Sequence, residues 1–222
     1  NKGIGQCITP IGIIYNKDKV TEPPTSWTDL WNPKYKGQVT LWDYKWYALV
    51  IAALLNGGDE NNIDPGFNVW SEHADQIHSL YNSNDQLKNL LVSGDAYISH
   101  WFASIYKTWA DEGAPLGFAI PKEGVVAFPA YLQIVKGCTP EQKKVAEDII
   151  NILLSPEANG RYAELTNNLP TVKGAKLSEA VANDPIFAPE VVDNAINYDW
   201  STIAKKNNEW KDRWDKEVKA KM

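Results

Sequence analysis

Hydrophobic and polar residues occur in alternating blocks along this chain, and the blocks predict strands and helices in turn. Short apolar runs that end in turn residues are typical of β-strands. Such runs occupy residues 11–15, 38–42, 96–101, 116–120 and 130–135. Because helical patterns separate most of them, they predict an α/β fold with a mainly parallel sheet that is covered on both faces.

Capping residues mark where the predicted helices begin, since a Ser, Thr or Asp side chain can accept hydrogen bonds from the first free amides. The expected N-caps are Ser26, Asp43, Ser83, Thr139 and Ser155. The corresponding helices are expected at 27–31, 44–55, 84–92, 140–154 and from 156 onward. Further helices are expected at 66–81 and after Ser201, where Ile203, Trp210, Trp214 and Val218 form one apolar stripe.

Charge and composition exclude several classes of partner. The 22 Lys and Arg residues are interspersed with 28 Asp and Glu residues, for a net charge of -6, so no basic stripe is offered to nucleic acid. No apolar run approaches the roughly 20 residues that a membrane span needs, so direct membrane insertion is not expected. Ten Trp and ten Tyr residues are available to pack the core or to face an apolar ligand.

Catalytic and cofactor motifs are missing from the sequence. It has no GxSxG elbow, no GxxxxGK phosphate loop and no GxGxxG fingerprint. His73 and His78 are five residues apart, which misses the i, i+4 spacing of a helical metal-ligand pair. We therefore expect no enzyme activity, no cofactor and no metal site. His100 lies at the exit of a predicted strand, where it would either donate to a ligand carboxylate or bond to the backbone.

Two motifs near the start of the chain carry a resemblance to a known family. Ile11-Gly12-Ile13-Ile14-Tyr15-Asn16-Lys17-Asp18 and then Ser26-Trp27-Thr28-Asp29-Leu30-Trp31-Asn32-Pro33-Lys34-Tyr35-Lys36-Gly37 resemble spermidine/putrescine-type periplasmic binding proteins. The resemblance continues through Ser93-Gly94-Asp95-Ala96, Pro121-Lys122-Glu123-Gly124, Leu153-Leu154-Ser155-Pro156-Glu157 and Leu169-Pro170-Thr171. It therefore spans nearly the whole chain.

The resemblance implies a type II periplasmic binding protein fold, in which two lobes joined by hinge strands close on a solute. The receptor would then deliver the solute to the permease subunits of an ABC importer, in the periplasm or at the outer face of a single-membrane bacterium. Lobe two would comprise residues 12–119, and residues 1–11 and 120–222 would be the remainder of an incomplete lobe one. The uncovered surface of that lobe would drive self-association of the fragment.

The resemblance also identifies candidate ligand-binding residues. The positions that are acidic in polyamine binders correspond here to Tyr44, Tyr47 and Ala130. Only the adjacent Asp43 has a carboxylate, and Asp43 is also an expected helix cap. The aromatic wall would include Trp101 or Phe102, Phe128 and Tyr131. Asp199-Trp200 would bring a last polar contact into the cleft, although Asp199 is equally suited to cap the final helix.

Loss of the carboxylates favours an amine-containing or zwitterionic solute over a simple polyamine, because each charge-assisted contact contributes roughly 1.5–3 kcal/mol. Trp42 and Trp46 are interpreted as lobe packing. Cys7 and Cys138 flank the two hinge strands and leave one disulfide open. Two other functions stay open, namely the sensor lobe of a signalling receptor and a carbohydrate-active enzyme.

Overall fold

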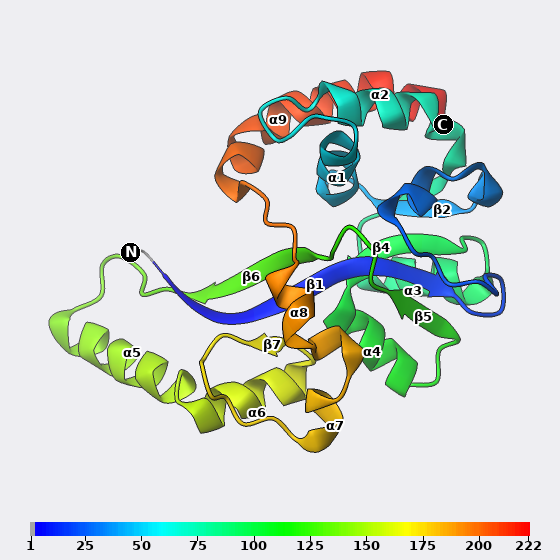
Figure 1. The fold of residues 1–222 in the computed structure, drawn as a ribbon. Coiled ribbons are helices and arrows are strands. Elements are labelled where there is room, and N and C mark those ends of the chain that lie inside the picture. Colours follow the sequence, from blue (N-terminus) through cyan, green and yellow to red (C-terminus); the bar gives the residue numbers. More distant parts are fainter. Residues whose placement is uncertain (1–2) are drawn as a thin grey trace.

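One long strand, β1 (Ile4–Asn16), runs through the molecule and carries most of its sheet (Figure 1). The computed structural model describes residues 3–222, without the side chains of residues 180, 189 and 192. The other strands within this range are β2 (Val39–Trp42), β3 (Ile77–Tyr81), β4 (Ile98–Phe102), β5 (Leu116–Ala119), β6 (Val126–Leu132) and β7 (Leu169–Pro170). The mixed α/β fold that was expected is therefore present.

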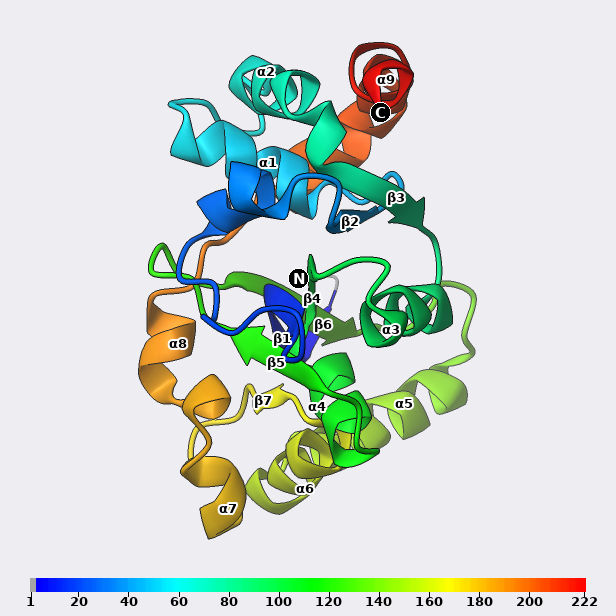
Figure 2. The same cartoon turned by 90° about the vertical axis from the view of Figure 1, so that its right-hand side faces the viewer.

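The helices of residues 3–222 surround this sheet. The α-helices are α1 (Tyr47–Leu55), α2 (Asp64–Glu72), α3 (Asn84–Ser93), α4 (Ala103–Asp111), α5 (Pro140–Leu153), α6 (Pro156–Thr166), α7 (Glu179–Ala182), α8 (Pro189–Asp193) and α9 (Trp200–Glu217). The short 3-10 helices are η1 (Trp27–Trp31), η2 (Pro33–Tyr35), η3 (Ala74–Gln76), η4 (Pro185–Phe187) and η5 (Lys219–Lys221). Figure 2 shows α1, α2 and α9 at one end and α5, α6 and α7 at the other, with β1 between them.

The sheet has the order β3-β2-β4-β1-β5, and β6 and β7 also pair with β1. β2 is parallel to β3 and β4, but β1 is antiparallel to all four of its neighbours. The prediction of a mainly parallel sheet is therefore wrong. Helical crossovers do join strands that run the same way, from β2 to β3, β3 to β4 and β4 to β5, but β1 lies between β4 and β5 and runs in the opposite direction.

β1 serves two parts of the sheet in succession. Its residues Ile11–Tyr15 pair with β4, whereas Ile4–Ile11 pair with β6. Ile11, Ile13 and Ile14 are fully buried, as expected for a central strand that is covered on both faces. β6 begins four residues before the predicted strand at 130 and ends three residues before its predicted end, because its partners in β1 fix its length.

Four of the predicted N-caps are confirmed by side-chain hydrogen bonds. Ser26 caps η1, Ser83 caps α3, Thr139 caps α5 and Ser155 caps α6. Ser26 and Thr139 each form a complete capping box, with Asp29 and Gln142 respectively. Local sequence signals were sufficient at these four positions because each capping side chain accepts from an amide two or three residues away.

Two other helix predictions are wrong. α1 begins at Tyr47 and not at Tyr44, because Tyr44 adopts a left-handed φ of 56° and Asp43 forms an ion pair with Lys219 instead of capping. The helix expected at 66–81 is α2 only as far as Glu72, and residues 77–81 form β3. Pairing with β2 overrides the helical pattern there. α4, which follows β4 directly, was not predicted.

The C-terminal helix lies apart from the rest of the predicted lobe-one remainder. On α9, the rings of Trp210 and Trp214 lie 5.9 Å and 6.2 Å from that of Trp46, and Trp214 is 6.4 Å from Trp70 of α2. The expected apolar stripe is confirmed, with Ile203, Trp210, Trp214 and Val218 all buried. The predicted division placed all of residues 120–222 outside the 12–119 body, and it stays a prediction; the packing of α9 against α2 and the start of α1 is the observation that bears on it.

Apolar side chains are exposed around α5, at the opposite end of the molecule. Val145, Ile149 and Ile152 on α5 are exposed, as are Ile4 and Val135 nearby. No described residue of α5 is buried, and a groove of about 730 Å³ separates the helix from the ends of β1 and β6. Exposed apolar surface of this kind favours association.

We expect this chain to self-associate through the face formed by Ile4, Val135, Val145, Ile149 and Ile152. Light scattering after size-exclusion chromatography should show a mass that rises with concentration. Ile149→Glu combined with Ile152→Glu should reduce that mass to the monomer, whereas Val92→Glu, at an exposed apolar site on α3, should not. A monomer at every concentration would contradict the prediction.

Candidate functional site

A cavity of about 480 Å³ opens where the carboxyl ends of β2 and β4 meet β1 and β6. Ligands of open α/β sheets bind at such strand ends. The side chains that line the cavity come from both parts of the sheet and from the helices beside it: Cys7, Thr9, Trp42, Lys45, Tyr47, Asn84, Trp101, Phe102, Ser104, Ile105, Phe128, Ala130, Tyr162 and Asn168. We refer to this cavity as the aromatic cleft.

Stacked and edge-on rings form the wall of the aromatic cleft. Trp42 lies parallel to Trp101, with 4.4 Å between ring centroids, and the indole nitrogen of Trp101 donates to Asn84 Oδ1 over 2.8 Å. Phe102 meets Phe128 edge-on at 5.2 Å. Rings at these distances pack against one another, so the wall is formed by contacts within the protein itself.

Tyr47 lies at the centre of this wall, at the start of α1. Its ring is within 6.4 Å of those of Trp101, Phe102, Phe128 and Trp200. Burial raises the pKa of Tyr47 to about 12, so the phenol is neutral at physiological pH. Its hydroxyl has no hydrogen-bond partner among the described residues, and it is therefore available to a ligand in the cavity.

Four of the predicted site residues line the aromatic cleft: Tyr47, Trp101, Phe102 and Phe128. No choice between Trp101 and Phe102 is needed, because both residues line the aromatic cleft. Trp101 is only 3% exposed and forms the base, while Phe102 is partly exposed beside it. Trp200 lines a smaller cavity of about 230 Å³, together with Tyr44, Tyr47 and Phe128.

Asp43 and Tyr44 are held by the C-terminal end of the chain. Lys219 Nζ lies 2.8 Å from an oxygen of Asp43 and 2.7 Å from the Tyr44 hydroxyl, which also donates to Asp215 over 2.9 Å. Burial alone would lower the pKa of Lys219, but hydrogen bonds with Asp43, Tyr44 and Asp215 raise it well above its usual value. Asp43 is thus engaged in an ion pair with Lys219, and it does not line the aromatic cleft.

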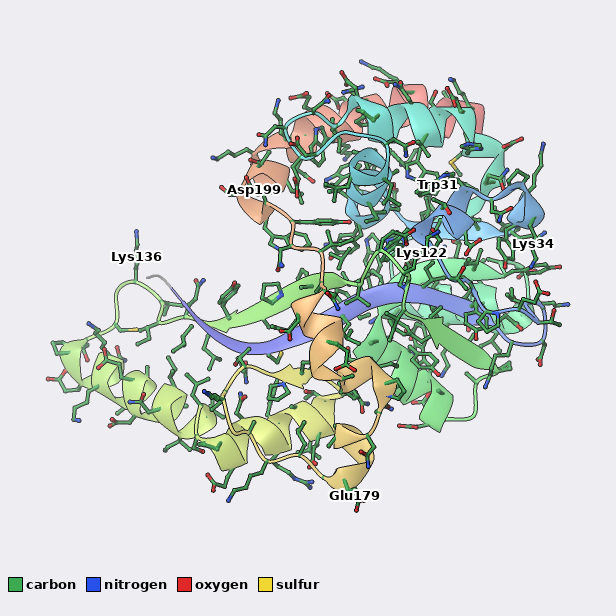
Figure 3. All side chains as sticks on the ribbon, viewed as in Figure 1. Trp31, Lys34, Lys122, Lys136, Glu179 and Asp199 are labelled. Atoms are coloured by element: carbon green, nitrogen blue, oxygen red, sulfur yellow. The ribbon has the colours of Figure 1, made fainter. Side chains whose placement is uncertain are left out.

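Asp199 and Tyr131 also lie outside the lining. Asp199, at the start of α9 in Figure 3, accepts hydrogen bonds from the backbone amides of Ser201 and Thr202. It is the N-cap, and the hydrogen bond from Thr202 Oγ1 holds its pKa below the usual value. Tyr131 is 58% exposed, because alternate residues of a strand face opposite sides and Phe128 and Ala130 face the cleft.

Sequence reasoning missed several residues of the aromatic cleft. Trp42 was assigned to packing, although its position at the end of β2 could have identified it. Lys45 lies between the predicted positions Tyr44 and Tyr47, but it is not part of a family motif. Thr9 lies on β1 and Asn168 lies two residues after the end of α6, and their side chains bond to each other, a pairing across 159 residues that no local pattern shows.

His100 is buried behind the wall and does not line the cleft. It has 0% exposure, and neither ring nitrogen has a hydrogen-bond partner among the described residues. Both functions considered for it, as a ligand donor or as a backbone-bonded histidine, are therefore absent. Burial lowers the pKa of His100 to about 3, so its ring is neutral.

The possible disulfide is not present, and both thiols are free. Cys7 lines the aromatic cleft, where burial raises the pKa of its thiol. The Cys138 thiol instead donates to the carbonyl oxygen of Val135, three residues before it.

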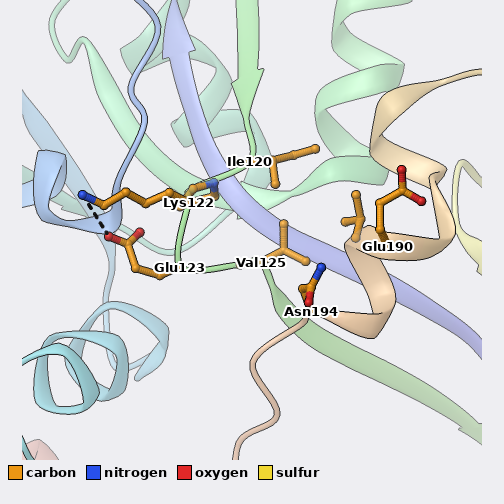
Figure 4. Close-up of a pocket in the computed structure, with 9 residues that line it drawn as sticks. Ile120, Lys122, Glu123, Val125, Glu190 and Asn194 are labelled. Carbon is orange, nitrogen blue, oxygen red and sulfur yellow. Dashed lines mark ion pairs between the residues drawn. The ribbon is translucent and has the colours of Figure 1, made fainter.

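A second cavity of about 390 Å³ lies between the loop at residues 120–125 and α8, and it shares no lining residue with the aromatic cleft (Figure 4). Its Glu123 accepts hydrogen bonds from the Ser26 hydroxyl at 2.6 Å and the Trp27 amide at 3.2 Å, and it lies 4.0 Å from Lys122. Because Glu123 is used to fasten η1 to this loop, we assign the second cavity a structural role.

Charge is sparse in the aromatic cleft. Its lining contains no Asp or Glu residue, and Lys45 is the one charged side chain among the described lining residues.

No group of three or more His, Cys, Asp or Glu side chains within the described part of the chain could hold a metal ion. The described helices include none that is long and apolar enough to cross a membrane.

Comparison with known proteins identifies the family. The model of the family described as "Bacterial extracellular solute-binding protein" matches residues 5–193, most of the chain. The chain belongs to this family. It is a family of solute-binding proteins and not of enzymes, in agreement with the prediction from the missing catalytic motifs.

The similar proteins support the same fold and are longer than this chain. The spermidine/putrescine-binding periplasmic protein of Escherichia coli is 29% identical over 91% of this chain and 56% of its own length. A gamma-aminobutyric acid-binding protein of Pseudomonas aeruginosa is 25% identical over 78% of this chain and 51% of its own. The chain thus spans about half the length of these relatives. The crystal structure of an ABC transporter from Clostridium perfringens superimposes with a TM-score of 0.83 at 24% identity, over 98% of this chain and 69% of the other.

Proposed function

We propose that this chain is part of an extracytoplasmic receptor of an ABC importer, which captures a small organic solute in the aromatic cleft and delivers it to a membrane permease. The observation that supports it most is the position of the cleft, which lies between the two parts of the sheet that share β1. A relative motion of these parts would open and close the cleft.

We propose two lobes joined by three segments. One lobe would contain residues 12–119 together with α9, and the other would contain residues 3–11 and 126–193. The joining segments would be β1, the loop at 120–125 and the segment at 194–199. The backbone of Ile196 bonds to Val125 and Ala127 over 2.8 Å and 3.0 Å, so two of these segments would move together.

The solute would be amine-containing or zwitterionic and not a simple polyamine. Stacked aromatic faces attract an organic ammonium, each contributing about 0.5–2 kcal/mol. A polyamine also needs carboxylates for its desolvated charges, and the lining of the aromatic cleft provides none. One relative is a gamma-aminobutyric acid-binding protein, which is consistent with a smaller zwitterion. The same lack of facing carboxylates argues against the carbohydrate-active enzyme.

A thermal-shift screen of the complete protein tests the proposal, because a ligand at roughly 100 times its dissociation constant adds about 2.7 kcal/mol to the free energy of unfolding. Zwitterionic amino acids should raise the melting temperature, while spermidine and putrescine should have little effect. A strong polyamine shift would contradict the solute class, and turnover of a sugar substrate would contradict the receptor function.

We expect Phe128→Ala to weaken binding of whichever solute the screen identifies by roughly tenfold, the equivalent of about 1.4 kcal/mol. Tyr131→Ala is the matched control, since it removes a ring from the same strand on the opposite face. Isothermal titration calorimetry should show unchanged affinity for that control. Equal losses in both variants would place the solute elsewhere.

A further inference from the structure

We infer that Lys45 binds an oxyanion group of the solute, so that the receptor selects molecules with a carboxylate at one end and an amine at the other. This inference rests on the proposed function, because it takes the aromatic cleft to be the solute site. It goes further in assigning the carboxylate to one residue and one corner of the cleft.

Lys45 is unpaired in a cavity without carboxylates. It forms no ion pair with any described residue, and its ammonium group lies 5.8 Å from the centroid of the Trp42 ring. Lys45 is exposed at the rim of the cavity, where its charge would repel a solute ammonium beside it. A solute carboxylate would meet an opposite charge instead, and the aromatic rings farther along the wall would remain free for the amine.

The loop that carries Lys45 is fixed on both sides. Tyr44 holds a left-handed φ of 56°, which few non-glycine residues adopt, and its hydroxyl is bonded to Asp215 and Lys219. On the other side, the indole nitrogen of Trp46 donates to Asn207 of α9 over 2.8 Å. A backbone anchored at both neighbours positions the Lys45 stem at the cleft before the solute binds.

Asn84 provides a second group that suits an oxyanion. Its Oδ1 atom accepts the hydrogen bond from Trp101, so its amide NH₂ group, which has no partner among the described residues, is left to donate. Asn84 is also the first residue of α3, a helix of 10 residues whose N-terminal end favours negative charge. Asp85 follows in the same turn but does not line the cleft.

Three probes with the same four-carbon chain test the assignment in the complete protein: 4-aminobutanoate, its neutral amide 4-aminobutanamide, and 1,4-diaminobutane. Calorimetry should show that the zwitterion binds roughly tenfold more tightly than the amide, and the diamine most weakly. Lys45→Gln should weaken 4-aminobutanoate about tenfold and leave the amide unchanged, whereas Lys45→Arg should keep the preference. Lys122→Gln, which removes an exposed charge from the second cavity, should change nothing.

Two results would overturn the assignment to Lys45 and leave the receptor function standing. One is an equal loss for the zwitterion and the amide in Lys45→Gln, and the other is tighter binding of the diamine than of the zwitterion. Binding of none of the three probes to the wild-type protein would instead count against the proposed amine-containing solute class, and the assignment would fall with it.

Discussion

Acidification should destabilise this protein through His100. The folded state keeps the ring neutral, with a pKa of about 3, whereas an unfolded histidine titrates near 6.5. Below about pH 6.5 the unfolded state therefore binds a proton that the folded state does not, so the free energy of unfolding decreases as the pH is lowered. The loss should continue at up to about 1.4 kcal/mol per pH unit and level off near pH 3, for a total of roughly 4–5 kcal/mol.

The environment of His100 explains why its ring resists protonation. Both nitrogens are buried without a partner among the described residues, and its aromatic neighbours are the rings of Tyr47, at 5.8 Å, and Trp101, at 6.5 Å. Its own carbonyl oxygen accepts the hydroxyl of Tyr81, which satisfies the backbone but not the ring. An imidazolium here would thus be a buried charge without compensation.

Urea unfolding from about pH 8 down to pH 4 measures the effect. The His100→Leu variant cannot take up the proton and loses no hydrogen bond of the ring, so its stability should fall less steeply below pH 6.5 than that of the wild type. His78→Gln removes an exposed histidine as a control and should keep the wild-type slope. The difference between the slopes separates His100 from the carboxylates that titrate in the same range, and identical slopes would refute the prediction.

The sequence was informative where the signal and its structural partner lie close together in the chain. Ser83 and Ser155 predicted helix starts because each cap acts on an amide three residues away. The buried stripe of α9 followed from helical periodicity. The long pairing of β1 with β6 could not be predicted, since strand partners more than 100 residues apart leave no local pattern.

The same distinction divides the candidate site. Tyr47 was predicted from the family motifs, and either Trp101 or Phe102 was predicted from the resemblance and the strand end, without a choice between the two. The role of Asp43 was not, because its charge is determined by Lys219, 176 residues further along the chain. Whether a cleft is acidic or basic thus depends on which charged side chains the fold pairs with each other. Lys219, just after α9, forms an ion pair with Asp43, and Lys45 is left as the charged side chain of the described cleft lining.

The second large effect should come from that returning helix. Trp214→Ala is expected to lower the free energy of unfolding by about 3–5 kcal/mol, as is usual for a large buried aromatic residue. Trp214 is 4% exposed, and its ring lies within 6.5 Å of those of Trp46, Phe67 and Trp70. The cavity would separate α9 from α1 and α2, so the anchors of the loop around Lys45 should loosen as well.

Two variants of α9 make this prediction specific. Trp214→Phe keeps a ring and removes an indole N–H that is buried without a partner among the described residues, so it should cost only about 1 kcal/mol. Lys205→Ala, on the exposed side of the same helix, should be neutral. Chemical unfolding followed by tryptophan fluorescence measures all three. A loss below about 1 kcal/mol in Trp214→Ala would mean that α9 does not pack against α1 and α2, and the proposed lobe division would be wrong.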